Sequence, residues 1–226
     1  GSVRIVLFLL LFTGRISSSH LFGSSPMRNR FLVCLIVALE ILTAVFITRL
    51  VGISEEPYVA NNTIYDFNQY NHLANALLSG NLSLNLPVSD SLMLMDNPYD
   101  PSLRDAVLSS ANEYYYMDYA FYNGKYYSYF GVLPVLLLYI PFQLMTGVAL
   151  STNDAVTILS IVYIVAVNIM VISILSKSSM HCRISYFAVA SLTLSTCSGF
   201  LYIAFLPQIY SVPIMLGLSV VYCGIS

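Results

Sequence analysis

Acidic and aromatic side chains that could do chemistry gather in one stretch of this chain, residues 52–130. Nine of the 11 acidic residues lie there against only Arg104 and Lys125, a local net charge of about −7 compared with −2 for all 226 residues. Twelve of the 18 tyrosines lie there as well. Tyrosine rings stack on sugar faces and their hydroxyls form hydrogen bonds, so the stretch suits polyhydroxylated ligands or cations. A folded cap with an interfacial belt of tyrosines would have the same composition.

Asp66 is the first candidate in this stretch, because it stands just before a predicted helix. The apolar residues that follow recur at the spacing of one helical face, and Gly80 can end the helix; they are Tyr70, Leu73, Ala74, Leu77 and Leu78. The pattern predicts a short amphipathic helix along the membrane surface, started by Asp66 or Asn68. A carboxylate at that place either caps the helix or takes part in chemistry.

Two further motifs follow along the same stretch. Residues 96–101 read Asp-Asn-Pro-Tyr-Asp-Pro, which favours turns, although its clustered oxygens could also bind a cation. The motif lacks the spacing and glycine of a calcium-binding loop. Asn123-Gly124 stands between aromatic runs and predicts a small aromatic β-hairpin. Lys125 beside this turn either meets a phosphate or is solvated.

The rest of the chain has the composition of a membrane protein. Hydrophobic residues make up 58% and charged residues 9% of the sequence, and soluble domains carry roughly 25% charged residues. A membrane span needs about 20 apolar residues. Four such spans are expected at residues 31–51, 131–150, 155–175 and 184–206, and another begins at residue 211.

The predicted organisation has four parts, and we expect the last to be truncated at its C-terminal end. They are an N-terminal apolar and basic segment (1–30), a transmembrane helix (31–51), an extracytoplasmic loop (52–130) and further transmembrane helices (131–226). Residues 3–12 are too short for a span and suggest either a signal-peptide core or the tail of a truncated helix. We expect an all-α polytopic membrane protein with a mixed α/β extracytoplasmic loop.

Glu40 lies near the middle of the span at residues 31–51. An ionisable side chain at that depth is costly and must face protein, water or a partner. The position of Glu40 therefore predicts one of two roles. Glu40 is either a residue of a functional site or transport pathway, or it forms a helix–helix hydrogen bond with its carboxyl protonated.

The orientation of the spans contains a conflict. The arginines of residues 15–30 place that segment in the cytoplasm and the acidic loop outside. If every predicted span crosses the membrane, the basic loop that contains Lys177 and Arg183 also lies outside. This placement disagrees with the rule that positive loops stay in the cytoplasm. A re-entrant segment around Pro134 and Pro141 would remove the conflict.

Two strings resemble polytopic glycosyltransferases of the GT-C superfamily, over roughly residues 31–226. DFNQYNHLANALLSGNLSL follows the first membrane helix and resembles the opening of their first extracytoplasmic loop. DNPYDPSLR…YYMDYAFYNGKYYSYFGVLPVLLLYIPFQLMTG resembles a bacterial subgroup of such proteins. The resemblance implies a sugar carried on a polyprenyl phosphate or diphosphate and transferred with inversion, with an acid at the start of the first loop as general base or acceptor-orienting group.

The resemblance assigns roles to seven residues. Asp66 would be the catalytic acid, and Asp118 a second base or a cation ligand. The implied substrate contacts are Tyr70, His72 and Tyr126, with Arg104 and Lys125 as cations for the lipid phosphate. No second acid stands beside Asp66, which puts a metal-binding role of this segment in doubt; a divalent cation is the one cofactor left open.

The expected function is glycosyl transfer from a lipid-linked sugar donor to a cell-envelope glycan or protein acceptor. The expected location is a bacterial plasma membrane, crossed several times and in contact with membrane lipids. A net charge of −2 gives no basic field for nucleic acid. Two alternatives remain: a transporter or flippase of lipid-linked glycans, and a non-catalytic scaffold with a glycan-binding loop.

Overall fold

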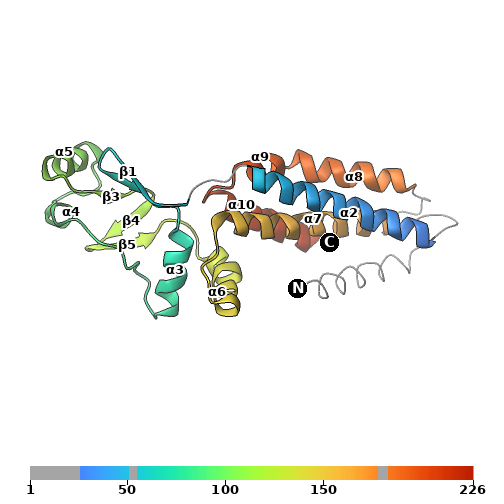
Figure 1. Cartoon of the computed structure of the whole chain (residues 1–226), viewed down its shortest axis with the longest axis horizontal. Helices are drawn as coiled ribbons and strands as arrows, with labels where there is room; N and C mark the ends of the chain where they lie inside the picture. The colour runs from blue at the N-terminus through green and yellow to red at the C-terminus, as the bar shows by residue number, and fades with distance from the viewer. Residues whose placement is uncertain (1–25, 51–54, 178–182, 226) are drawn as a thin grey trace. The chain divides into compact units, whose positions relative to one another are not determined.

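The computed structural model describes residues 26–50, 55–177 and 183–225, in two compact units (Figure 1). The first unit comprises Gly1–Gly52 and Val156–Ser226, and the second comprises Ile53–Ala155. The segment at residues 3–12 and the arginine at position 15 lie outside the described residues. The chain is mostly helical, with a small amount of sheet in the second unit.

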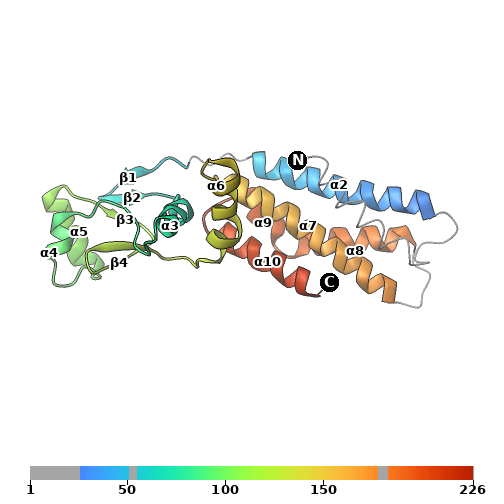
Figure 2. The same cartoon turned by 90° about the horizontal axis from the view of Figure 1, so that it is seen from below.

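The first unit is a bundle of apolar helices. Its helices are α2 (Pro26–Leu50), α7 (Thr152–Lys177, whose first turn belongs to the second unit), α8 (Ile184–Cys197), α9 (Phe200–Phe205) and α10 (Ser211–Ile225). Figures 1 and 2 show α2, α7 and α8 lying side by side. Among the described residues, two helices are long and apolar enough to cross a membrane, Arg28–Leu50 and Thr152–Lys177. These correspond to the spans expected at residues 31–51 and 155–175.

The other two expected full spans were wrong, for local backbone reasons. Residues 131–150 form only a π-helical turn, η2 (Val135–Tyr139), and a short helix, α6 (Ile140–Thr146). Pro134 and Pro141 flank this turn, and proline removes a helical hydrogen bond. Residues 184–206 are divided between α8 and α9 at Gly199, which has a φ of 78° that ends a right-handed helix.

A buried polar cluster joins three helices of the bundle. Glu40 of α2 is 8% exposed, and Asn168 of α7 and Ser191 of α8 are each 0% exposed. The Asn168 amide donates to one oxygen of Glu40 at 2.7 Å, and the Ser191 hydroxyl lies 2.6 Å from the other. The structure thus uses Glu40 for helix–helix hydrogen bonds, one of the two roles that its sequence position allows.

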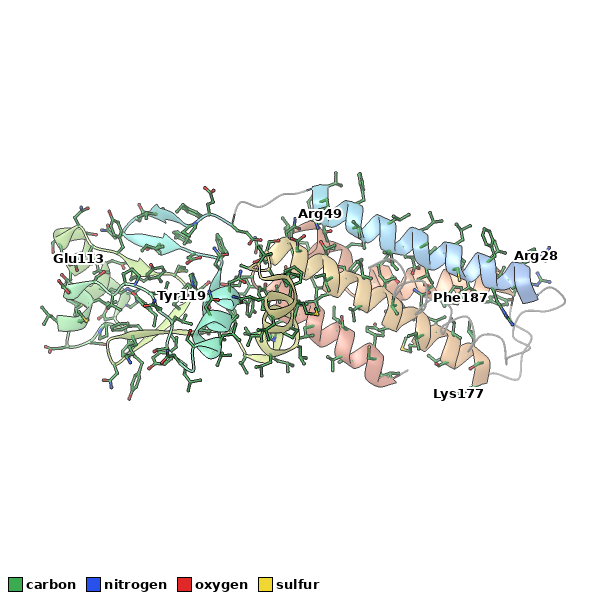
Figure 3. All side chains as sticks on the ribbon, turned by 60° about the horizontal axis from the view of Figure 1, so that its bottom comes forward. Arg28, Arg49, Glu113, Tyr119, Lys177 and Phe187 are labelled. Carbon is green, nitrogen blue, oxygen red and sulfur yellow. The ribbon has the colours of Figure 1, made fainter. Side chains whose placement is uncertain are left out.

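Two basic residues of the bundle, Arg28 and Lys177, lie at one end, and Arg49 lies at the other (Figure 3). Because α2 and α7 run antiparallel, with Thr48 bonded to Thr157 and Glu40 to Asn168, the start of α2 lies beside the end of α7. Figure 3 shows Arg28 and Lys177 at this end and Arg49 at the other. Residues 131–150 form no full-length helix, so only two full-length helices separate the basic segment at the start of α2 from the basic loop after α7. Both basic segments then fall on the same side of a membrane, and the conflict in orientation disappears.

The second unit is a mixed α/β fold, as the sequence predicts for this loop. Its three-stranded sheet contains β1 (Tyr58–Ala60), β2 (Thr63–Tyr65) and β3 (Tyr115–Tyr116); β1 and β2 pair antiparallel and β3 lies parallel to β2. Asn61 and Asn62, with φ of 47° and 57°, turn the chain between β1 and β2. Three helices lie in the long connection from β2 to β3, namely α3 (Gln69–Leu78), α4 (Asp90–Leu94) and α5 (Pro101–Ala111).

The amphipathic helix and the aromatic hairpin are both confirmed. The helix is α3 (Gln69–Leu78), which ends in a Schellman motif with Gly80 at φ 75° and Asn81 N–H bonded to Ala76 C=O at 2.8 Å. The hairpin pairs β4 (Tyr119–Tyr122) with β5 (Lys125–Ser128) around Asn123 and Gly124, whose φ are 53° and 70°. Both turn residues are left-handed, as a type I′ turn requires.

The second unit also extends further than the predicted loop, which ended at residue 130. It continues to Ala155 because η2 and α6 pack on α3. The rings of Tyr70 and Tyr139 are 5.2 Å apart, and Gln143 donates to Asn75 at 2.8 Å.

Glu40→Ala should lower the free energy of unfolding by about 1–3 kcal/mol, because the buried Asn168 and Ser191 lose their shared partner. Glu40→Gln should retain most of the stability, since a carboxamide can both accept and donate. The measurement is thermal unfolding of the full chain in detergent by circular dichroism. Leu39→Ala, at a 55% exposed neighbour, is the matched control; a Glu40→Ala variant as stable as wild type would contradict the prediction.

Candidate functional site

Asp66 is held between the sheet and α3. It follows β2 directly, is 6% exposed, and accepts the Asn68 backbone N–H on Oδ1 at 2.9 Å. Asn68, not Asp66, occupies the N-cap position of α3, and its side chain makes no capping bond. Asp66 is therefore not the N-cap of α3, and its second carboxylate oxygen, Oδ2, is available to another partner.

The second partner of Asp66 is His72, one turn into α3. His72 Nε2 lies 2.8 Å from Asp66 Oδ2. Burial raises the pKa of the Asp66 carboxyl, but hydrogen bonds from His72 and Asn68 outweigh burial and hold the pKa below the ordinary aspartate value. Asp66 is therefore ionised at neutral pH and can only accept, so His72 Nε2 carries a hydrogen and Nδ1 is the basic nitrogen of the neutral ring.

His72 lines a pocket of about 570 Å³ in the second unit, which we call the polar pocket. Its other lining residues include Asn75, Asn81, Ser83, Asn85 and Lys125. Amide and hydroxyl groups of this kind both donate and accept hydrogen bonds, which fits a polyhydroxylated ligand. Lys125 is the only lysine or arginine among the described residues that line it, and it places one positive charge there.

A second cavity of about 460 Å³, the aromatic pocket, lies in the same unit. It is lined chiefly by tyrosines and includes Tyr115, Tyr116, Tyr119, Tyr126, Tyr129 and Arg104. The Arg104 guanidinium carbon lies 3.8 Å from the centre of the Tyr115 ring, a cation–π contact. Asp118 also lines this pocket, from a left-handed backbone position with φ of 59°.

Gln69 connects these parts and was missed by the sequence analysis. It is 1% exposed; its Nε2 donates to the Asp118 carbonyl at 2.6 Å, and its Oε1 accepts the Tyr129 N–H at 3.4 Å. The Tyr119 hydroxyl donates to the Asp66 carbonyl at 3.3 Å, and Tyr119 lies near α3 in Figure 3. The hairpin is thereby tied to the segment that carries Asp66 and His72. Both contacts join residues about 50 positions apart, so no local sequence signal announces them.

The structure divides the predicted site residues among three places. His72 and Lys125 line the polar pocket, and Asp66 is bonded to His72 without lining it. Asp118, Arg104 and Tyr126 line the aromatic pocket. Tyr70 lies in the core: it is 1% exposed, and its ring contacts Phe130 and Tyr139. A core position leaves Tyr70 no surface for the substrate contact that the resemblance implies.

The turn motif at residues 96–101 starts a helix. Asp100 Oδ1 accepts the backbone N–H of Ser102 at 3.0 Å and of Leu103 at 3.3 Å, and Pro101 is the first residue of α5. Asp100 is therefore an N-cap, which accounts for the motif. In the part of the chain that the structure describes, no three His, Cys, Asp or Glu side chains are grouped so as to hold a metal ion.

Comparisons with family models, curated proteins and solved structures found no match for this chain. Its class therefore follows from its own fold and site. It is a mostly helical protein with two helices long and apolar enough to cross a membrane, joined in sequence to a small α/β unit in which a buried aspartate is bonded to a partly exposed histidine.

The pKa of Asp66 predicts how stability changes in acid. Because this pKa is lower in the folded protein than the ordinary value of about 3.9, the carboxylate stabilises the fold above that pH and ceases to do so as the pH falls through the folded pKa. Thermal unfolding between about pH 6 and pH 3 should show a shallower acid loss in Asp66→Asn than in wild type. Asp90→Asn, at an exposed position, is the control and should follow wild type; parallel curves for all three proteins would refute the prediction.

The Asp66–His72 hydrogen bond also predicts a histidine tautomer. The neutral ring of His72 should carry its hydrogen on Nε2, which ¹⁵N NMR of histidine-labelled protein can detect. The chain has only 3 histidines, so the spectrum of a His72→Gln variant assigns the signal. Asp66→Ala should give a mixture of tautomers, because nothing then fixes Nε2–H. A wild-type ring protonated on Nδ1 would show that Asp66 does not hold it.

Proposed function

We propose that this protein transfers a glycosyl group from a polyprenyl-phosphate-linked sugar donor to a cell-envelope acceptor at the outer face of a membrane. The GT-C resemblance implies this reaction. The observation that supports it best is the ionised, buried Asp66 bonded at 2.8 Å to His72, where His72 lines a pocket rich in amide and hydroxyl groups. Such a pair can accept a proton from a hydroxyl at neutral pH.

The orientation of the bundle is consistent with this location. Positive residues favour the cytoplasmic side of a membrane, and Arg28 and Lys177 mark one end of the bundle. The second unit joins the chain at the opposite ends of these helices, after Leu50 and before Val156. It would therefore lie outside the cell, where a lipid-linked donor and an envelope acceptor meet. An integral, multi-pass protein of a bacterial plasma membrane is part of this proposal.

His72 would be the catalytic residue and Asp66 the positioning residue. An acceptor hydroxyl attacks the anomeric carbon of the donor, the bond from that carbon to the phosphate oxygen breaks, and the hydroxyl proton passes to His72 Nδ1. Asp66 stabilises the imidazolium that forms, and Lys125 stabilises the negative charge on the departing phosphate. Attack opposite the leaving group inverts the anomeric centre.

A transport role has less support. A transporter needs polar groups available to a substrate within its spans. Glu40, Asn168 and Ser191 instead bond with one another across three helices. A scaffold would keep its glycan contacts and tolerate the loss of His72.

The test is transfer of a radiolabelled sugar from polyprenyl phosphate by membranes that contain the full-length protein. His72→Gln should reduce turnover by about 10²- to 10⁴-fold, because the proton acceptor is lost. Asp66→Asn should reduce it less and should change the pH profile, since it acts through His72. Donor binding should persist in both variants.

Asp90→Asn is the matched control, a carboxylate of the same unit that lines neither pocket. It should transfer sugar at the wild-type rate. Equal transfer by wild type and His72→Gln would remove the pair from the chemistry. Failure of the wild-type protein with several donors would favour the transporter or the scaffold.

A further inference from the structure

We propose that the aromatic pocket binds a neutral sugar ring, and that the acceptor is therefore a glycan and not a protein. The identification of this sugar with the acceptor depends on the proposed function, whereas the binding itself does not. The pocket of about 460 Å³ is large enough for one pyranose ring and part of a neighbouring one.

The walls of the pocket are a preorganised set of tyrosine rings. Tyr116 meets Tyr119 at 5.4 Å and Tyr126 at 5.1 Å, both edge-to-face, and Tyr126 is 1% exposed. Edge-to-face rings at these distances stabilise one another, so the cluster loses little freedom when a ligand binds. Tyr129 and Tyr99 line the same pocket and are 71% and 60% exposed, so their faces are open to a ligand.

The polar groups of the pocket suit hydroxyls. Arg104 is held over Tyr115, and its buried Nε has no hydrogen-bond partner within the described residues. The ion pair between this Nε and Asp105 Oδ1 is 3.7 Å long, too long for a hydrogen bond. Arg104 lines the pocket, so its guanidinium can supply hydrogen-bond donors to a ligand that carries hydroxyls.

The charge of the unit selects a neutral ligand. Residues 52–130 carry nine acids against Arg104 and Lys125. An excess of negative charge repels anionic ligands. A neutral hexose or N-acetylhexosamine fits better than a uronic acid, although the latter could pair with Arg104.

The pocket also lies beside the proposed reaction site. Tyr119 contributes to its wall, donates to the Asp66 carbonyl at 3.3 Å, and has its ring 6.5 Å from the His72 ring. A sugar held against Tyr119 is therefore near the group proposed to take a proton from it.

The experiment is saturation-transfer-difference NMR of the full chain in lipid nanodiscs, because maltoside detergents would compete for the site. The probes are the methyl glycosides of glucose, galactose, mannose and N-acetylglucosamine, with methyl glucuronide as the anionic comparison. At least one neutral glycoside should receive saturation from the protein. Tyr129→Ala and Tyr99→Ala should each weaken its binding by about three- to tenfold, from the loss of one stacking ring.

Tyr122→Ala is the matched control: it removes a 64% exposed tyrosine of the same hairpin that does not line the pocket. It should leave binding unchanged. No transfer to any neutral glycoside, preferential binding of methyl glucuronide, or equal losses in all three variants would overturn the proposal. Glycoside binding without glycosyl transfer would support the sugar site and refute the proposed function. Glycosyl transfer without glycoside binding at this pocket would support the proposed function and refute the sugar site.

Discussion

Both units of this protein depend on the same constraint: a carboxyl group taken out of water needs hydrogen-bond partners. In the bundle, Glu40 receives donors from two neighbouring helices, Asn168 from α7 and Ser191 from α8. In the second unit, Asp66 receives them from the Asn68 backbone and the His72 ring. The donors to Glu40 come from separate helices and therefore hold those helices in one alignment. The donors to Asp66 come from the adjacent turn and the first turn of α3, and they fix only the Asp66 side chain. The first arrangement serves packing, and the second can serve chemistry.

The second unit is positioned by its turns more than by its strands, which are two to four residues long. Every non-glycine residue with positive φ in the described ranges is an Asn or Asp, the types that tolerate this conformation best. They are Asn61, Asn62, Asn112, Asp118 and Asn123. Asp118 shows how such a residue can serve the site through its backbone, because its left-handed conformation precedes β4 and its carbonyl accepts the amide of Gln69.

Sequence patterns over neighbouring residues predicted the elements whose formation depends on neighbouring residues. The periodicity from Tyr70 to Leu78 gave α3, and Asn123-Gly124 gave the hairpin, because each depends on residues adjacent in sequence. The turn at Asn61-Asn62 also had a local signal, because asparagine tolerates the left-handed conformation, but this turn was not predicted. Contacts between distant residues were beyond such reasoning: β2 pairs with β3 across about 50 residues, and Gln69 reaches Asp118. The full spans at residues 131–150 and 184–206 failed because hydropathy does not register a proline-flanked turn or a left-handed Gly199.

Asp66 links the two pockets through hydrogen bonds, although it lines neither of them. Its carboxylate bonds to His72, which lines the polar pocket, and its backbone carbonyl accepts the hydroxyl of Tyr119, which lines the aromatic pocket. A ligand that displaced the Tyr119 ring would therefore disturb the segment that fixes His72. Gln69, the first residue of α3, opposes such movement by bonding to the hairpin at two points. The Gln69 side chain and the Tyr119–Asp66 hydrogen bond together make the region between the two pockets rigid. This rigidity would keep the His72 imidazole oriented on one side while a sugar binds on the other.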